Sequence, residues 1–594
     1  MSTRPASKPR HNPLQLLLRI RNFVVLTIKT WLKGIGLQEP IEECPAWPPD
    51  LFALAGTLIR RSGAYLRVFQ RRDPTAYAKD IATAGRKWRR QLDAITLDAK
   101  DVTPADLKEA RTPDVLRGWS RLIQAKGRGI SAIGKLDELA EDLIRLTLIA
   151  DEASRGIGVT WNNKTARGKG KRSQFLSMAG RALADKNNES YCWDVPTEAL
   201  CVVGKQHTPM KGATFRSLSH HLALYHPSEI KAIWILPPAK TVERPRPRPG
   251  LNLLLLPWPE RVETPDFQQI SIGAMRTDGS EPPTYFRYDP KETSDPTHFE
   301  KRLREALRRA YEHAGPIDAI VFPELALTKS QYDAAERIAF EARSILICGL
   351  RQARPAEGDW DSNVSVLQVA GAVREAVLDS TKDDDLLKDL RLGQAKHHRW
   401  YLDHDQIINY QLGGALLPSR GAWEHVELKH PRVLHFVTVN ATTWSVLICE
   451  DLARQDPAAD LIRAVGPNLL IALLMDGPQL SNRWPARYAA VLAEDPGTSV
   501  LTLTSLGMAE RSRPILGSGQ RAPVSRVIAL WRDAIEGEIQ IALDADHNAC
   551  VLNLEYQMKT EYCADGRSDY GQTRYPVYAG YRSFKVEDTP KTAA

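Results

Sequence analysis

The chain has 594 residues, of which 43% are hydrophobic and 26% charged, and its formal net charge is +8. A domain usually occupies about 100–200 residues, so this length indicates at least two domains with large hydrophobic cores. The ordinary composition excludes a disordered or fibrous chain. Seven scattered cysteines show neither a disulfide framework nor a C-x-x-C metal pair, which favours a reducing, cytoplasmic compartment.

The first segment with a clear pattern is residues 14–37, where apolar stretches are interrupted by Arg19, Arg21, Lys29 and Lys33. No apolar run approaches the roughly 18 residues that a transmembrane helix requires. We interpret the segment as a basic amphipathic helix that either lies on a membrane or packs on its own protein. Packing is favoured because core helices outnumber interfacial ones.

Helical spacing continues over residues 50–153, where apolar positions recur every three or four residues. Residues 164–172 are rich in Gly, Lys and Arg and indicate an exposed loop. A further helix is expected over residues 217–224. The polar and cationic side chains before it either bind an anion at the helix N-terminus or belong to a cap formed by Ser217.

Charge is unevenly divided along the chain. Residues 1–250 contain 42 Lys+Arg against 24 Asp+Glu, a net +18, whereas the remainder contains 38 against 48, a net −10. A basic region beside an acidic one predicts contact with nucleic acid, a membrane surface or an acidic partner. A solvated basic face without a partner is the alternative.

Residues 237–250 contain prolines and charges without periodicity and indicate a linker. Before it, residues 1–236 form a mainly helical, basic region. From residue 251 to 594, short apolar runs alternate with amphipathic helices, which predicts an α/β domain. The predicted helices include HFEKRLREALRRAYEHAG, SQYDAAERIAFEAR and PAADLIRAV. The predicted strands are LNLLLLPW, DAIVFPE, SILICGL, NVSVLQVA, RVLHFVTV, WSVLICE, NLLIALLM, TSVLTLTS, SRVIALW and EIQIALD.

Three reactive side chains follow predicted strands or lie in polar loops: Glu324 in VFPELALT, Lys396 in QAKHHRW and Cys449 in LICED. Singly, such residues are more often surface charges or inert core cysteines. In this order, however, the three segments resemble the three sequence blocks of the nitrilase superfamily of carbon–nitrogen hydrolases. The resemblance covers roughly residues 251–555. It implies a nitrilase-like α-β-β-α sandwich and, because members commonly pair, a homodimer.

The resemblance also implies a role for each of the three residues. A thiol with a pKa of about 8.5 is mostly protonated at neutral pH, so Cys449 needs a base to become a nucleophile. Glu324 is expected to be that base and later the acid. Lys396 is expected to hold the oxyanion, together with the backbone N–H that follows Cys449. Water then hydrolyses the thioester.

This sequence departs from the family pattern beyond the lysine. Many members have a second glutamate there, and the segment HHRWYLDHDQIINY offers Asp403, Asp405 or Gln406 in its place, with no basis for choosing among them. The spacing of 53 residues between Lys396 and Cys449 is also long, which predicts an inserted loop around residues 417–432 that shapes the pocket.

The adjacent pair His397 and His398, with Asp403 and His404 nearby, raises the question of a metal site. Their spacing is wrong for a zinc motif, so no metal and no cofactor are expected.

The segments LICEDLA and VFPELALT are most similar to the glutamine-hydrolysing domain of NAD synthetase, which favours an amide over a nitrile substrate. The ATP-binding SGGxDS motif of that enzyme and the Walker sequence are missing.

The leading hypothesis is therefore a cysteine-dependent hydrolase of amide or carbamoyl-type bonds. One alternative is a nitrilase-like effector or sensor, for example in bacterial antiviral defence, whose basic N-terminal region binds nucleic acid or a partner. Another is a pseudoenzyme used for assembly.

Overall fold

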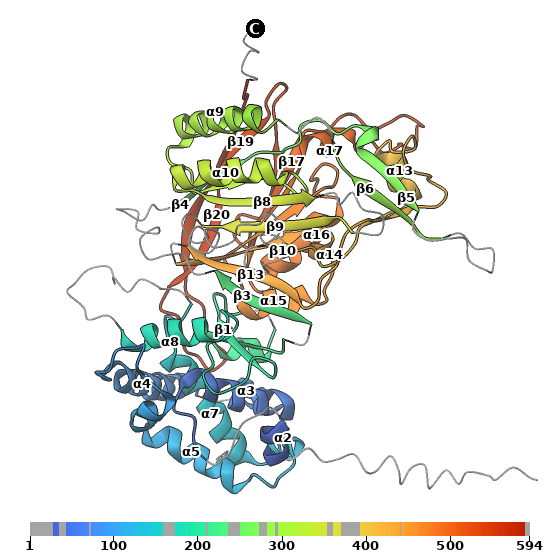
Figure 1. The fold of residues 1–594 in the computed structure, drawn as a ribbon. Helices are drawn as coiled ribbons and strands as arrows, with labels where there is room; N and C mark the ends of the chain where they lie inside the picture. Colours follow the sequence, from blue (N-terminus) through green and yellow to red (C-terminus); the bar gives the residue numbers. More distant parts are fainter. Residues whose placement is uncertain are drawn as a thin grey trace, which may run out of the picture.

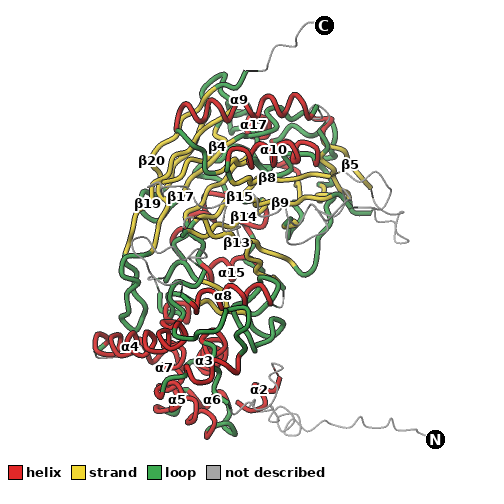
Figure 2. The backbone as a smooth tube through the Cα atoms, turned by 60° about the vertical axis from the view of Figure 1, so that its left-hand side comes forward, coloured by secondary structure: helices red, strands yellow, loops and turns green. Residues whose placement is uncertain are grey.

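The structure is a computed structural model, and it describes residues 28–34, 43–70, 73–158, 173–209, 212–227, 229–235, 250–271, 282–290, 295–352, 360–369, 393–439 and 441–587. Over these ranges the chain is a mixed α/β protein in which the N-terminal helices gather at one end and the strands, flanked by further helices, occupy the rest (Figure 2). No helix in the described ranges is long and apolar enough to cross a membrane.

The N-terminal part contains helices that pack on one another (Figure 1). Their bounds are α2 Ile28–Gly34, α3 Pro48–Ser62, η1 Ala64–Gln70, α4 Pro74–Asp93, η2 Pro104–Ala110, α5 Pro113–Gln124, α6 Ile130–Ile133, α7 Asp137–Ala153 and α8 Gln174–Asp185. Helix α7 contacts α3, α4 and α5, and its LIRLTLIA segment is mostly buried among them. Helix α3 begins with two prolines and ends at Gly63, whose φ of 74° suits a glycine C-cap.

The helix predicted over residues 217–224 is wrong. The chain there forms a short 3₁₀ turn, η3 (Phe215–Leu218), followed by strand β2 (Leu222–Tyr225), which pairs antiparallel with β1 (Cys201–Gly204). All eight residues of the two strands are buried, so tertiary pairing overrides the helical propensity of LALY. No helix N-terminus is available at residue 217 to bind an anion.

The first seven-stranded sheet has the order β10-β9-β8-β7-β4-β19-β20. Its strands are β4 Gly250–Leu255, β7 Ala319–Val321, β8 Ile345–Gln352, β9 Ser362–Gln368, β10 Gln394–Ala395, β19 Ala549–Lys559 and β20 Thr573–Phe584. Two helices, α9 (Pro296–Ala314) and α10 (Lys329–Ala342), cover its outer face through a shared apolar cluster (Figure 1).

The second seven-stranded sheet has the order β18-β17-β16-β15-β14-β13-β3. Its strands are β3 Ile230–Ile235, β13 Arg432–Val439, β14 Thr442–Ile448, β15 Leu469–Leu474, β16 Ser499–Thr504, β17 Val527–Arg532 and β18 Glu538–Ala542. The helices that follow its strands are α14 Glu450–Ala453, α15 Ala458–Val465, α16 Trp484–Glu494 and α17 Leu506–Arg511. All ten strands predicted from residue 251 onward lie in one of these two sheets.

The two sheets pack face to face, which explains why their strands are almost wholly apolar. In β15, Leu469 and Ile471 point into the cluster between the sheets, whereas Leu470 and Ala472 point into the cluster on the outer side. A strand buried on both faces gains from apolar residues at every position. The result is a four-layer arrangement of helices, two sheets and helices.

Strand β3 links the two parts of the chain. It precedes the predicted linker, yet it pairs in parallel with β13 along its whole length, from Ile230 opposite Arg432 to Ile235 opposite Val437. The N-terminal part therefore supplies an edge strand of the second sheet. Gly250 begins β4, and the rest of the predicted linker lies outside the described residues, as do residues 164–172 and most of 14–37.

A smaller four-stranded sheet lies beside the sandwich in the order β11-β12-β6-β5 (Figure 1). Its elements and the neighbouring helix are β5 Phe267–Ser271, β6 Thr284–Tyr288, β11 Tyr401–Leu402, β12 Ala422–Glu424 and α13 His404–Asn409. Strand β12 falls within the segment expected to be an inserted loop, and it pairs in parallel with β6. This pairing fixes the position of Glu424.

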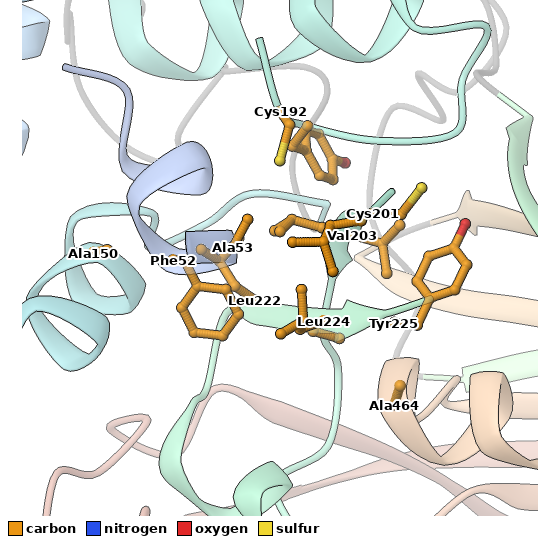
Figure 3. Close-up of a cluster of buried hydrophobic side chains, with 14 of the residues drawn as sticks. Phe52, Ala53, Ala150, Cys192, Cys201, Val203, Leu222, Leu224, Tyr225 and Ala464 are labelled. Atoms are coloured by element: carbon orange, nitrogen blue, oxygen red, sulfur yellow. The ribbon is translucent and has the colours of Figure 1, made fainter. Parts of the chain in front are cut away.

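Charged groups are buried where the β19–β20 loop enters the N-terminal part. Arg567 is 3% exposed, and its guanidinium lies 2.7 Å from Asp565, 3.1 Å from Asp151 and 3.4 Å from Glu152. Apolar packing also joins the N-terminal part to the second large sheet's helix α15, as Figure 3 shows for Leu224 and Tyr225 of β2 near Ala464.

Candidate active site

Glu324 lies just beyond β7, in a turn whose backbone packs closely against strand β8. The residue after it, Leu325, has a φ of 52°, which is uncommon for a non-glycine residue. A side chain at Gly349 in β8 would place its Cβ 2.6 Å from the Glu324 Cα and from the Leu325 nitrogen. Glycine at position 349 therefore lets this turn sit against the sheet, and the Glu324 side chain is buried beside it.

Lys396 follows the short strand β10, and its backbone N–H donates to the carbonyl of Asn363 at 3.0 Å. Its ammonium donates to Oε1 of Glu324 at 2.8 Å and to Oε2 of Glu424 at 2.6 Å. Lys396 is 1% exposed, so its ammonium is shielded from bulk water and is bound by two carboxylates instead. The structure thus brings two of the three sequence-predicted residues into direct contact.

Glu424 and Asn363 belong to the same cluster, and the sequence did not single them out. The Asn363 amide donates to Glu324 Oε1 and to Glu424 Oε1, each at 2.8 Å. Glu424 also accepts from the backbone N–H of Trp400 at 3.1 Å. Glu424 ends a three-residue strand with few sequence cues, and Asn363 is one of several polar residues in β9, so their convergence is visible only in three dimensions.

The three residues proposed for the second acidic position do not fill it. Asp403 caps helix α13 by accepting from the Gln406 backbone at 2.8 Å, and the Gln406 side chain accepts from the Asp403 backbone in return. Asp405 is exposed in the first turn of that helix. The acidic group paired with Lys396 is instead Glu424, from the segment predicted to be inserted.

Cys449 lies at the junction of β14 and the short helix α14. Its backbone has φ 44° and ψ −106°, a conformation that costs a non-glycine residue free energy and is concentrated at functional sites. A hydrogen bond of 2.8 Å from its N–H to the carbonyl of Leu473 ties this turn to β15. Cys449 is 2% exposed, so the surrounding structure restricts the position of its thiol.

The electrostatic environment links the thiol to both charged groups. Burial raises the pKa of the Cys449 thiol well above its usual value; the negative charge of Glu324 raises it further, and the positive charge of Lys396 opposes the rise. Burial likewise raises the pKa of Glu324 despite Lys396. Burial lowers the pKa of Lys396, but the two glutamates more than compensate and raise it well above its usual value. At neutral pH the lysine is therefore charged and the thiol protonated.

Glu324 has one oxygen available for chemistry. Its Oε1 accepts from Lys396 and Asn363, whereas its Oε2 is buried and has no hydrogen-bond partner among the described residues. A buried carboxylate oxygen without a partner is costly and calls for an explanation. Proton transfer with a substrate or with the thiol would give this oxygen a function.

Asp451, two residues after Cys449, holds the segment that carries Lys396. Its carboxylate accepts from the backbone N–H of His397 and of His398, at 3.0 to 3.1 Å, and from Nδ1 of His398 at 3.0 Å. The two histidines therefore belong to this backbone anchor. Within the described ranges, no group of three or more His, Cys, Asp or Glu is arranged to hold a metal ion.

A second polar group follows the neighbouring strand β15. Asp476 accepts from Arg483 at 2.6 Å and from the hydroxyl of Tyr410, and its negative charge contributes to the raised pKa of Cys449. Its other carboxylate oxygen is buried and lacks a partner among the described residues.

Comparison with solved structures returns proteins that resemble about half of this chain. An amidase from Nesterenkonia sp. is 12% identical and covers 52% of this chain and 92% of its own, with a TM-score of 0.30. Saccharomyces cerevisiae Nit3, a member of branch 10 of the nitrilase superfamily, is 11% identical and covers 52% and 90%, with a TM-score of 0.30. A mutant of the amidase from Nesterenkonia sp. AN1 that carries the acetamide moiety of fluoroacetamide on its active-site cysteine is 12% identical, covers 52% and 92%, and has a TM-score of 0.30. Neither a protein-family profile nor a curated protein matches the sequence significantly.

Proposed function

We propose that the protein is a cysteine-dependent hydrolase of non-peptide carbon–nitrogen bonds of amide or carbamoyl type, with Glu324, Lys396 and Cys449 as its catalytic residues. The observation that carries the proposal is the buried Lys396 ammonium held by two carboxylates, one of which keeps a free oxygen, beside a cysteine in a strained turn. The sequence blocks around these residues support assignment to the nitrilase superfamily.

The first half of the reaction uses the free oxygen of Glu324. It takes the proton from the Cys449 thiol as the sulfur attacks the amide carbon, because a thiol with a raised pKa is a poor nucleophile until it is deprotonated. The C–N bond then breaks as Glu324 returns that proton to the departing nitrogen. The products of this half are a thioester on Cys449 and a free amine or ammonia.

Lys396 stabilises the negative charge that develops on the substrate oxygen. Its ammonium is already fixed by Glu324 and Glu424, so it needs little reorganisation during the reaction. The backbone N–H of Glu450, the first residue of α14, is the second donor in this proposal. Both donors act on the oxyanion of the first step and on that of the second.

The second half regenerates the enzyme. Glu324 removes a proton from water as the water oxygen attacks the thioester, and the sulfur leaves as a thiol after receiving that proton. The net reaction is amide plus water giving carboxylic acid plus amine. The same carboxylate serves twice as base and twice as acid, which suits a buried glutamate whose pKa lies above its ordinary value.

Ammonia release from a panel of primary amides and carbamoyl compounds tests the proposal, with the parent chain and the Cys449→Ala variant assayed side by side. Cys550→Ala is the matched control, because Cys550 is also buried but lies in β19. The parent and the control are expected to release ammonia, and Cys449→Ala to release none above background. Trapping with a slow substrate should add an acyl mass on the peptide containing residue 449. Equal turnover by Cys449→Ala and the parent would refute the assignment.

A further inference from the structure

A large cleft whose lining does not include Cys449 lies between the N-terminal part and helix α15. Its volume is about 790 Å³, within the range of about 300–1,000 Å³ typical of small-molecule sites. One wall comes from η1, η3 and β2, and the other from α15. Figure 3 labels Leu224, Tyr225 and Ala464, three of the apolar residues that line it.

The inner part of the cleft is cationic. Lys205, Arg216 and Arg463 line it and are buried or half-buried. Arg216 pairs with Asp495 through two hydrogen bonds of 2.8 and 2.9 Å, and Arg463 lies 3.9 Å from the same carboxylate. One carboxylate thus serves two guanidinium groups, which leaves an excess of positive charge.

Two of these cations form no hydrogen bond with a carboxylate of the described residues, and Arg463 lies 3.9 Å from Asp495 without one. The Nε of Arg463 is buried and has no hydrogen-bond partner within the described ranges. The Lys205 ammonium donates to the carbonyls of Arg216 and Ser219 and to the Ser219 hydroxyl, and forms no ion pair with the described residues. Burial is the main reason that the pKa of Lys205 falls to about 8. An anion bound here would relieve the cost of these buried charges.

The outer part of the cleft has a different chemistry. Tyr65 and Phe215 form an edge-to-face pair with ring centres 6.2 Å apart, and both are partly exposed. Glu229, Asp456 and Asp460 line the cleft and are exposed. The aromatic rings offer a surface for a planar apolar group, and the carboxylates offer acceptors for hydroxyl groups.

We propose that this cleft binds a nucleoside monophosphate, with its phosphate bound by Arg216 and Arg463 and attracted by the charge of Lys205, and with its base beside Tyr65 and Phe215. The ribose hydroxyls then donate to the carboxylates at the opening. Phosphate favours guanidinium groups because charge-assisted hydrogen bonds to it are strong. Cys449 does not line this site. Along the chain, however, only the short helix α14 separates Cys449 from α15.

Calorimetric titration of the full-length protein with AMP, adenosine, inorganic phosphate and glutamate tests the proposal. AMP is expected to bind at least tenfold more tightly than adenosine or phosphate alone, and glutamate not at all. Arg463→Gln should weaken AMP binding at least tenfold, and Tyr65→Leu severalfold with little effect on phosphate. Arg487→Gln is the matched control, because Arg487 is exposed on α16 and does not line the cleft.

The Cys449→Ala variant separates this proposal from the proposed catalytic function, since it should bind AMP as the parent does. Circular dichroism and thermal unfolding establish that Arg463→Gln is folded, and Tyr65→Leu provides the second variant if it is not. AMP binding that is absent at millimolar concentration, or unchanged in both cleft variants, would overturn the assignment. Phosphate that binds as tightly as AMP, or glutamate that binds in its place, would overturn the choice of a nucleotide.

Discussion

The Lys396 ammonium lies 2.6 Å from Oε2 of Glu424, a carboxylate that reaches it from a short strand of the smaller sheet. A second carboxylate, that of Glu324, binds the same ammonium from a strand end of the first large sheet. The two carboxylates have different tasks, because only Glu324 keeps an oxygen free of partners. In the proposed reaction, Glu424 is therefore a positioning residue for Lys396.

Glu424→Gln tests this role. The amide keeps the shape and one acceptor but loses the charge, so Lys396 is held less firmly where the oxyanion forms. We expect kcat to fall about 10- to 100-fold with a smaller change in KM, as for loss of an interaction made mainly in the transition state. Asp405→Asn, in the exposed first turn of α13, should leave both parameters unchanged. An unaltered kcat in Glu424→Gln would contradict the positioning role.

The pH dependence of kcat/KM should reflect Glu324. Its pKa lies above the ordinary value of 4.5 because of burial. The base must be ionised to accept the thiol proton, so activity is present above its pKa and lost as the pH falls through it. The acidic limb is therefore expected above pH 4.5. Steady-state rates between pH 4 and 9 measure this limb, and a midpoint at or below 4.5 would argue against a buried base.

Lys396→Gln should destabilise the fold in a pH-dependent way. The substitution leaves two buried carboxylates without a cation, a defect that costs about 3–5 kcal/mol. In the variant, loss of the lysine charge raises the folded-state pKa of Glu324 further above the unfolded value, so the destabilisation is present at neutral pH and disappears as the pH falls below about 4.5. Urea unfolding at pH 7 and pH 4.5 checks both parts. An equal loss of stability at the two pH values would contradict the explanation.

Arg567→Met should weaken the junction between the two parts of the chain. Burial raises the pKa of Asp151, but the Arg567 charge and other interactions lower it to about 2. Because this value lies below the unfolded one of 3.8, the stabilisation is present above pH 3.8 and lost as the pH falls towards 2. Removing Arg567 should cost about 3–5 kcal/mol at pH 7 and much less near pH 3. Arg582→Met, at an exposed position, should change stability by less than about 0.5 kcal/mol.

Much of the large sandwich could be predicted from the sequence. Strands such as β15, LLIALL, are apolar at every position because both faces are buried, and such runs are distinctive. The strands that were missed include the long β19 and β20, which mix buried residues with half-buried and exposed ones, and the short β12. Strand β12 has three residues and exposes Trp423, so it owes its conformation to pairing with β6 and β11.

In the candidate site, too, some residues have a local sequence signal and others do not. Glu324, Lys396 and Cys449 lie in segments with a recognisable local sequence, so the sequence could propose them, and the structure brings Glu324 and Lys396 into contact. Glu424 and Asn363 join them through hydrogen bonds across strands far apart in the chain, which no local pattern encodes. The assumption that the second acid lies close to Lys396 in sequence led to Asp403 and Asp405. Asp403 instead caps α13, and Asp405 is exposed in the first turn of that helix.

The pairing of β3 with β13 limits where the polypeptide can be divided. A fragment that begins at Gly250 would lack residues 230–235 and would leave the backbone of β13 unpaired along the edge of the second sheet. Bare sheet edges recruit strands from other molecules. Recombinant production of the part from Gly250 onward alone is therefore expected to yield aggregates, and a soluble version would have to retain the polypeptide from at least β3 onward.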